Sequence, residues 1–196
     1  MSTNNISTDT IKVWDPLVRI FHWSLVLSFF LAYITEDDWM NVHVIAGYTV
    51  ALLVAFRIVW GFIGTRYARF TQFIKSPSQV ISYIKKMREF DVPHYIGHNP
   101  AAAAMIISLI ISLIMVSFSG MVIIAAEGQG PLAGTMFATV NAEWMKDLHE
   151  LFANFTLLLV LLHVAGVVFS SFLEGDNLVR AMVTGNKKLR NEVLQK

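Results

Sequence analysis

Long apolar stretches alternate with shorter polar segments along this chain of 196 residues. Four stretches are long enough to cross a bilayer, whose hydrocarbon core requires about 20 helical residues. They cover residues 17–35, 42–63, 101–126 and 148–173. The pattern predicts an all-α integral membrane protein, a four-helix bundle in which residues 1–196 form a single domain.

The composition agrees with a membrane protein. Apolar residues make up 55% of the chain, charged residues only 15%, and the mean hydropathy is +0.56, far from the mixture typical of a soluble domain. Membrane lipid is therefore its expected surrounding, and a formal charge of +1 gives no reason to expect nucleic acid as a partner. The first ten residues are polar and lack a basic side chain, so we interpret the first apolar stretch as a retained helix rather than a signal peptide.

Basic residues are distributed unevenly between the polar segments. Six lie in the middle loop, residues 64–100, five follow the fourth span, and two lie at or before the start of the first, whereas the two remaining loops hold only Lys146. Lys and Arg are retained on the cytoplasmic side of membrane proteins. Both termini and the middle loop are therefore predicted to face the cytoplasm.

The middle loop is long enough to hold a short helix of its own. An amphipathic segment around residues 78–90 is interpreted as packing on the membrane surface. His94 and His98 lie in the same loop, and we expect both to be solvated or to cap loop backbone.

Four of the six histidines lie in or at the ends of the predicted spans, where such side chains are costly and indicate function. His149 and His163 are 14 residues apart, nearly four helical turns, so they share one helix face and differ in depth by about 21 Å. The direction of the other spans places His22 at the inner depth of His163 and His43 at the outer depth of His149. The sequence thus predicts two facing pairs, His22 with His163 and His43 with His149.

Two histidine pairs at two depths indicate two haem groups, each with its iron between two imidazoles. Six-coordinate iron has no open site for oxygen and suits electron transfer. The chain has no cysteine, which excludes disulfides, iron–sulfur clusters, thiolate zinc sites and covalent c-type haem. The expected cofactor is therefore non-covalent haem b. A haem-free alternative stays open, in which the histidines form hydrogen bonds between helices, relay protons or bind a metal ion.

Two arginines and two glycines lie near the predicted ligands. Arg57 follows His43 by 14 residues, which places it on the same face at the inner depth, where a haem propionate would balance its charge. Arg19 is a second candidate for a propionate contact. Gly47 and Gly166 lie on the ligand faces and would allow close approach of the haem. Alternatively, Arg57 extends its side chain to the surface and the glycines are ordinary helix-packing positions.

Several sequence motifs also occur together. In order they are VWDPLVRIFHW, HVIAGYTVALLVAFRIVWGFIG, GHNP and HELFANFTLLLVLLHVAGVV, followed by NLVRAMVTGNKK. The set resembles the bacterial cytochrome b561 family, including the b-type cytochrome subunits of nickel–iron hydrogenases, over residues 13–188. The resemblance implies a di-haem core with the four span histidines as axial ligands. It also implies a multi-pass protein of the bacterial inner membrane that transfers electrons between a periplasmic redox partner and the quinone pool of a respiratory chain.

The resemblance leaves the partner and the quinone site open. Hydrogenase-type members typically carry an additional membrane segment that we do not find in this sequence, which favours a c-type cytochrome over a hydrogenase-like partner. Quinone would bind in the inner region near Arg57, Arg66 and His98 or in the outer region near Asp37.

Two other functions remain as alternatives. The first is a stand-alone oxidoreductase that passes electrons from a small reductant such as superoxide to quinone; the net-acidic outer loops disfavour it, because an anion is steered by basic surfaces. The second is a haem-free membrane anchor or transporter. An electron-transfer subunit is thus favoured over a stand-alone enzyme.

Overall fold

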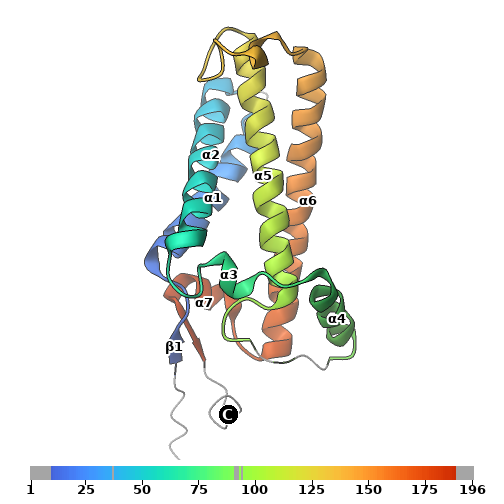
Figure 1. Cartoon of the computed structure of the whole chain (residues 1–196). Helices are drawn as coiled ribbons and strands as arrows, with labels where there is room; N and C mark the ends of the chain where they lie inside the picture. The colour runs from blue at the N-terminus through green and yellow to red at the C-terminus, as the bar shows by residue number, and fades with distance from the viewer. Residues whose placement is uncertain (1–9, 37, 91–92, 94, 189–196) are drawn as a thin grey trace, which may run out of the picture.

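The computed structural model describes residues 10–36, 38–90, 93 and 95–188. Its body is a bundle of four long helices (Figure 1), namely α1 (Pro16–Ile34), α2 (Met40–Ile63), α5 (Pro100–Ala126) and α6 (Ala142–Glu174). Each of the four is long and apolar enough to cross a membrane. The predicted all-α membrane bundle is confirmed.

Polar caps set where three of these helices begin. The carboxylate of Asp15 accepts a hydrogen bond from the Val18 amide at the start of α1, and Asn99 caps α5 in the same way; a proline follows each cap. Proline suits this position because the first helical amides have no partner within the helix. Asn141 caps α6, so this helix begins earlier than the predicted residue 148, and Trp144 and Lys146 belong to the helix rather than to the loop.

The bundle is made of two helical hairpins. Close backbone contacts join α1 to α2 and α5 to α6, and a smaller contact between α2 and α5 connects the hairpins. The shared core consists of Phe29, Val50, Val54, Leu113 and Val116. On the outer surface of the bundle, large apolar side chains stay exposed, as expected for helices in contact with lipid.

Short elements cover the end of the bundle that carries both ends of the described chain (Figure 1). They are β1 (Thr10–Lys12), α3 (Phe70–Phe73), α4 (Pro77–Arg88), α7 (Leu178–Thr184) and β2 (Asn186–Lys188); at the opposite end the loop before α6 contains η1 (Met136–Thr139). The helix α4 confirms the predicted amphipathic segment. The antiparallel pairing of β1 with β2 was not predicted.

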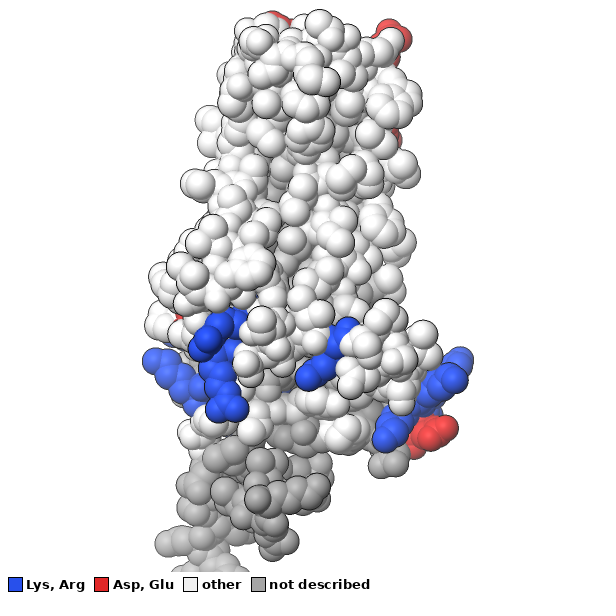
Figure 2. All heavy atoms as spheres, in the orientation of Figure 1, with Lys and Arg blue, Asp and Glu red and all other residues white. Residues whose placement is uncertain are grey.

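Charged side chains are segregated along the bundle. Figure 2 shows Lys and Arg gathered around the end that holds the short elements, while the face of the body above it is nearly free of charge. At the same end, Lys187 forms a buried ion pair of 2.8 Å with Glu174 and also donates to the backbone oxygen of Tyr95 at 2.9 Å. This contact attaches β2 to the end of α6. Below, this end is called the basic end.

Candidate functional site

The structure brings His22 and His163 together near the basic end. His22 lies in the first half of α1 and His163 in the second half of α6. Their ring centroids are 6.4 Å apart, with an angle of 52° between the ring planes. The Nδ1 atom of His22 is buried, and no described residue forms a hydrogen bond with it.

The other pair lies at the opposite end of the bundle. His43 is in the first turn of α2 and His149 in the first half of α6. Their ring centroids are 6.0 Å apart, with an interplanar angle of 72°. The two pairings that depth predicted from the sequence are thus the two that occur in the fold.

Hydrogen bonds orient both rings of the outer pair. His43 Nδ1 lies 2.8 Å from the backbone oxygen of Ala32, and His149 Nδ1 lies 2.9 Å from that of Val116 and 3.0 Å from Ser119 Oγ. A carbonyl oxygen only accepts, so each Nδ1 carries the hydrogen and the neutral ring keeps a lone pair on Nε2. This is the arrangement that supporting hydrogen bonds give to metal-binding histidines.

The spacing of both pairs suits a metal ion between the rings. Two metal–nitrogen bonds of about 2 Å, plus about 1.2 Å from each nitrogen to its ring centre, would put the centres of two imidazoles that bind one ion from opposite sides about 6.4 Å apart. The observed separations are 6.4 and 6.0 Å. Within the described residues no group of three or more His, Cys, Asp or Glu side chains is placed to hold a metal ion. Two imidazoles that face each other at this spacing fit a cofactor that supplies the remaining ligands itself.

The helices that carry the paired rings leave space for such a group. Among the described residues, α6 has few close backbone contacts with α1 or α2, although its histidines face both. A Cβ atom added at Gly47 or at Gly166 would meet no heavy atom within 4 Å. Neither glycine is therefore a point of close helix packing, which was the alternative interpretation. The residues present fit a planar haem at each pair.

Arg57 is buried at the basic end, with 5% of its surface exposed. Its Nη2 donates to the backbone oxygen of Ala68 at 3.0 Å, and its guanidinium lies 5.0 and 5.9 Å from the ring centroids of Phe70 and Phe73. Its Nη1 is buried and has no hydrogen-bond partner among the described residues. The side chain does not extend to the surface, and one donor is left for an anion.

Arg19 connects the start of α1 with α7 near the C-terminal end of the described chain. Its Nη1 donates to the backbone oxygen of Val183, just before Gly185, while its Nε is buried without a partner. The Nη1 donor of Arg19 thus fixes α7 against α1. Its Nε donor has no partner among the described residues, as is also the case for Nη1 of Arg57.

The expectation for His98 was wrong. Its ring is packed between Trp14 and Phe73, with ring centroids at 4.5 and 4.8 Å, and its Nδ1 is buried without a partner. The residue directly precedes the Asn99 cap of α5, which fixes its backbone. The place of His98 next to a helix cap, within the GHNP motif, was the feature of the sequence that pointed to an ordered position. His94 and Asp37 lie outside the described residues.

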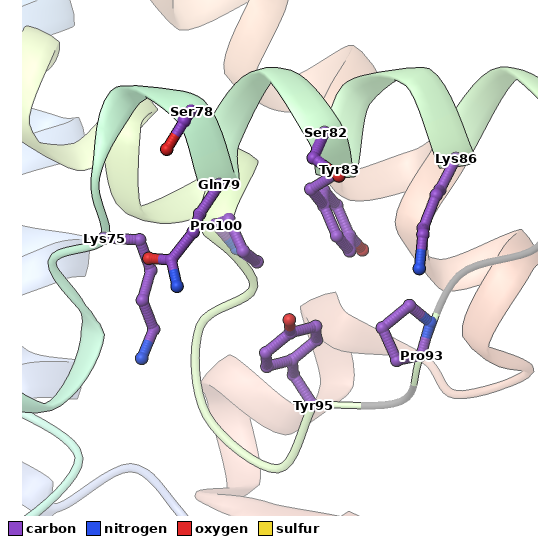
Figure 3. Close-up of a pocket in the computed structure, with 9 residues that line it drawn as sticks. All are labelled: Lys75, Ser78, Gln79, Ser82, Tyr83, Lys86, Pro93, Tyr95 and Pro100. Atoms are coloured by element: carbon purple, nitrogen blue, oxygen red, sulfur yellow. The ribbon is translucent and has the colours of Figure 1, made fainter.

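A separate groove lies between α4 and residues 93–100 (Figure 3). Its volume is about 430 Å³, and its lining residues are Lys75, Ser78, Gln79, Ser82, Tyr83, Lys86, Pro93, Tyr95 and Pro100. Burial, together with Glu174 and Tyr95, raises the pKa of Tyr83 to about 12, so its hydroxyl stays protonated. No member of either histidine pair lines this groove.

Comparison with known proteins gives consistent matches. The family described as Prokaryotic cytochrome b561 matches residues 13–185. The probable Ni/Fe-hydrogenase B-type cytochrome subunit of Rhodobacter capsulatus is 22% identical over 221 aligned residues, covering 95% of this chain and 84% of that protein. The protein of the same name from Bradyrhizobium diazoefficiens is 23% identical over 222 residues, covering 95% and 89%. No solved structure gives a significant match.

The family match covers all four long helices, both histidine pairs and the basic end except β1 and β2. It agrees with the resemblance carried by the sequence motifs and with four apolar helices that can span a membrane. The chain therefore belongs to the prokaryotic cytochrome b561 family, and it is a membrane b-type cytochrome of electron transport.

Proposed function

We propose that this cytochrome holds two haem b groups and transfers electrons across the bacterial inner membrane between a periplasmic redox partner and the quinone pool. The observation that carries the proposal is the presence of two facing histidine pairs, His22 with His163 and His43 with His149, near opposite ends of one apolar bundle. A cofactor at each end gives electrons a route through the low-dielectric layer that a single site would not give.

The protein's own groups fix and tune the two sites. The backbone oxygens of Ala32 and Val116 orient His43 and His149 with Nε2 available for iron. Arg57 and Arg19 each offer an unpaired buried donor to the carboxylates of the inner haem. Haem b supplies a one-electron couple, whose potential depends on ligands, nearby charge and burial. Because Arg57, the buried arginine of the described residues, lies near the inner pair, we expect the two potentials to differ.

The distribution of charge supports the orientation. Lys and Arg gather at the basic end (Figure 2), which the positive-inside rule assigns to the cytoplasm. The inner pair and the chain ends would then be cytoplasmic, and the acidic residues Glu36 and Asp38 would be part of the periplasmic face. Since two relatives are named as hydrogenase cytochrome subunits, the periplasmic partner is either a hydrogenase-like enzyme or a c-type cytochrome.

The first test is a reduced-minus-oxidised spectrum with haem quantified per chain. We expect two b haems in the wild-type protein. Alanine variants of His22 and His163 should each lose the same haem, and alanine variants of His43 and His149 the other. Leu158→Ala, an exposed position on α6 between the two histidines, is the matched control and should keep both. One haem, or losses that follow a different pairing, would contradict the proposal.

The second test addresses the electron route. Protein reconstituted in vesicles that contain ubiquinone or menaquinone is reduced from outside with a membrane-impermeant donor, and quinol formation is followed. Loss of quinol formation in either the inner or the outer histidine variant is expected, because both sites lie on the route. Quinol formation with superoxide alone as the donor would instead favour the stand-alone oxidoreductase.

A further inference from the structure

Within the described part of the chain, three buried nitrogen atoms near the inner histidine pair have no hydrogen-bond partner. They are Arg19 Nε, Arg57 Nη1 and His98 Nδ1. They come from α1, from α2 and from the segment before α5. A buried polar group without a partner costs free energy, so three at one place indicate a ligand that the chain itself does not supply.

Aromatic side chains hold these groups around one position. The ring of His98 contacts both Trp14 and Phe73, and the guanidinium of Arg57 lies 5.9 Å from the centroid of the same Phe73 ring. A Cβ atom at Gly185 would lie 2.7 Å from the Trp14 backbone oxygen and 3.5 Å from Arg19 Nε. The unpaired donors therefore surround one region of the basic end.

The acidic groups of this region are already engaged. Asp15 accepts hydrogen bonds from Thr65 Oγ1 at 2.6 Å and from the Trp60 indole at 3.3 Å, as well as capping α1. Glu174 is paired with Lys187 at 2.8 Å. Among the described residues, neither Arg57 nor Arg19 forms an ion pair with a carboxylate, and the buried positive charge of Arg57 requires an anion.

We propose that His98 donates a hydrogen bond to a carboxylate of the inner haem and completes, with Arg57 and Arg19, the site that holds both propionates. The proposal rests on the proposed function, since it requires a haem between His22 and His163. It adds a donor that lies outside the membrane spans and places the GHNP segment in the cofactor site.

The surroundings of His98 suit a neutral donor. Burial, followed by the positive charges of Arg57 and Lys187, lowers the pKa of His98 to about 3, so its ring is uncharged at neutral pH and has one N–H to offer. A flat ring fits between Trp14 and Phe73, where a third guanidinium would add repulsion to Arg57. His98 is a positioning residue, because it acts on the cofactor's side groups and not on the iron.

Two substitutions separate the hydrogen bond from the packing. His98→Phe keeps an aromatic ring between Trp14 and Phe73 but has no donor, whereas His98→Gln offers an amide donor without the ring. Holoprotein in detergent is mixed with excess apomyoglobin, and the loss of each haem is followed separately by its absorption. Loss of one hydrogen bond to a charged group predicts that the inner haem leaves His98→Phe roughly tenfold faster or more.

The outer haem is the internal control, because it lies at the other end of the bundle. Its dissociation rate should equal that of the wild-type protein in both variants, and His98→Gln should recover part of the inner affinity. An unchanged inner rate in His98→Phe would overturn the proposal, as would equal acceleration of both haems, which would indicate a structural role alone. If the wild-type protein contains no inner haem, the proposed function itself fails, which is a different result.

Discussion

Replacing Gly166 or Gly47 by leucine tests directly whether a planar cofactor lies beside the paired histidines. Gly166 follows His163 by one helical turn, and Gly47 follows His43 likewise. At both positions a Cβ atom would meet no heavy atom of the described chain within 4 Å. In the protein alone, therefore, the β-carbon of a leucine meets no described atom at either site.

Replacing either glycine by leucine is expected to change helix stability and haem affinity in opposite directions. Leucine in place of glycine favours the helix by about 0.8 kcal/mol, so the fold is not weakened. If a haem occupies the space, the added side chain must be accommodated at a cost of about 1–3 kcal/mol, which weakens binding roughly 5- to 150-fold. Gly166→Leu should act on the inner haem and Gly47→Leu on the outer one.

The assay is the rate of haem loss to apomyoglobin, read separately for the two haems. Ala165→Leu and Ala55→Leu are the matched controls, because both alanines are exposed on the same helices but on other faces, and both variants should behave like the wild-type protein. Full retention of both haems in the two glycine variants would refute the argument that the open space is the cofactor's position.

Three further outcomes are expected. Burial raises the pKa of the Asp15 carboxyl, but hydrogen bonds from Thr65, the Val18 amide and Trp60 outweigh burial and hold this pKa below its ordinary value of 3.8. The stabilisation from the ionised carboxyl is present above pH 3.8 and is lost as the pH falls further. Thermal melts of the wild-type protein should therefore decline more than those of Asp15→Asn below about pH 4. Arg57→Met should lower the potential of the inner haem alone, by roughly 40 mV if the lost charge interaction is about 1 kcal/mol; a redox titration checks this. Thr156→Val removes the buried 2.6 Å hydrogen bond to Ser112 between α5 and α6. It should lower the free energy of unfolding by roughly 0.5–1.5 kcal/mol in denaturant titrations. An unchanged midpoint would show that this hydrogen bond does not stabilise the bundle.

The positions of the membrane spans and the depths of the histidines could be predicted from the sequence, because they depend on local periodicity and on the thickness of the bilayer. Span length and hydropathy determine where the helices lie, and within a span the residue number determines depth. This is why His22 could be matched with His163 and His43 with His149 before any contact was known. The limits of α6 were less accurate, because the Asn141 cap adds a polar turn that hydropathy does not recognise.

Features that depend on distant contacts could not be predicted. The strands β1 and β2 are three residues each, too short for a periodic signal, and nearly the whole chain separates them. His98 was expected to be solvated or to cap loop backbone because it lies in a polar loop. Its burial depends on Trp14 and Phe73, which come from two other segments, so no local pattern reveals it.

The pairing of β1 with β2 has a consequence for biosynthesis. The Val13 and Trp14 amides, just ahead of α1, both donate to the backbone oxygen of Gly185, beyond α6. A nascent chain therefore cannot bring the start of its first helix to its final position until its last helix has left the ribosome. In the proposed ligation each iron likewise takes one histidine from each hairpin, so cofactor loading must follow complete insertion, and chains that stop before α6 would carry no haem.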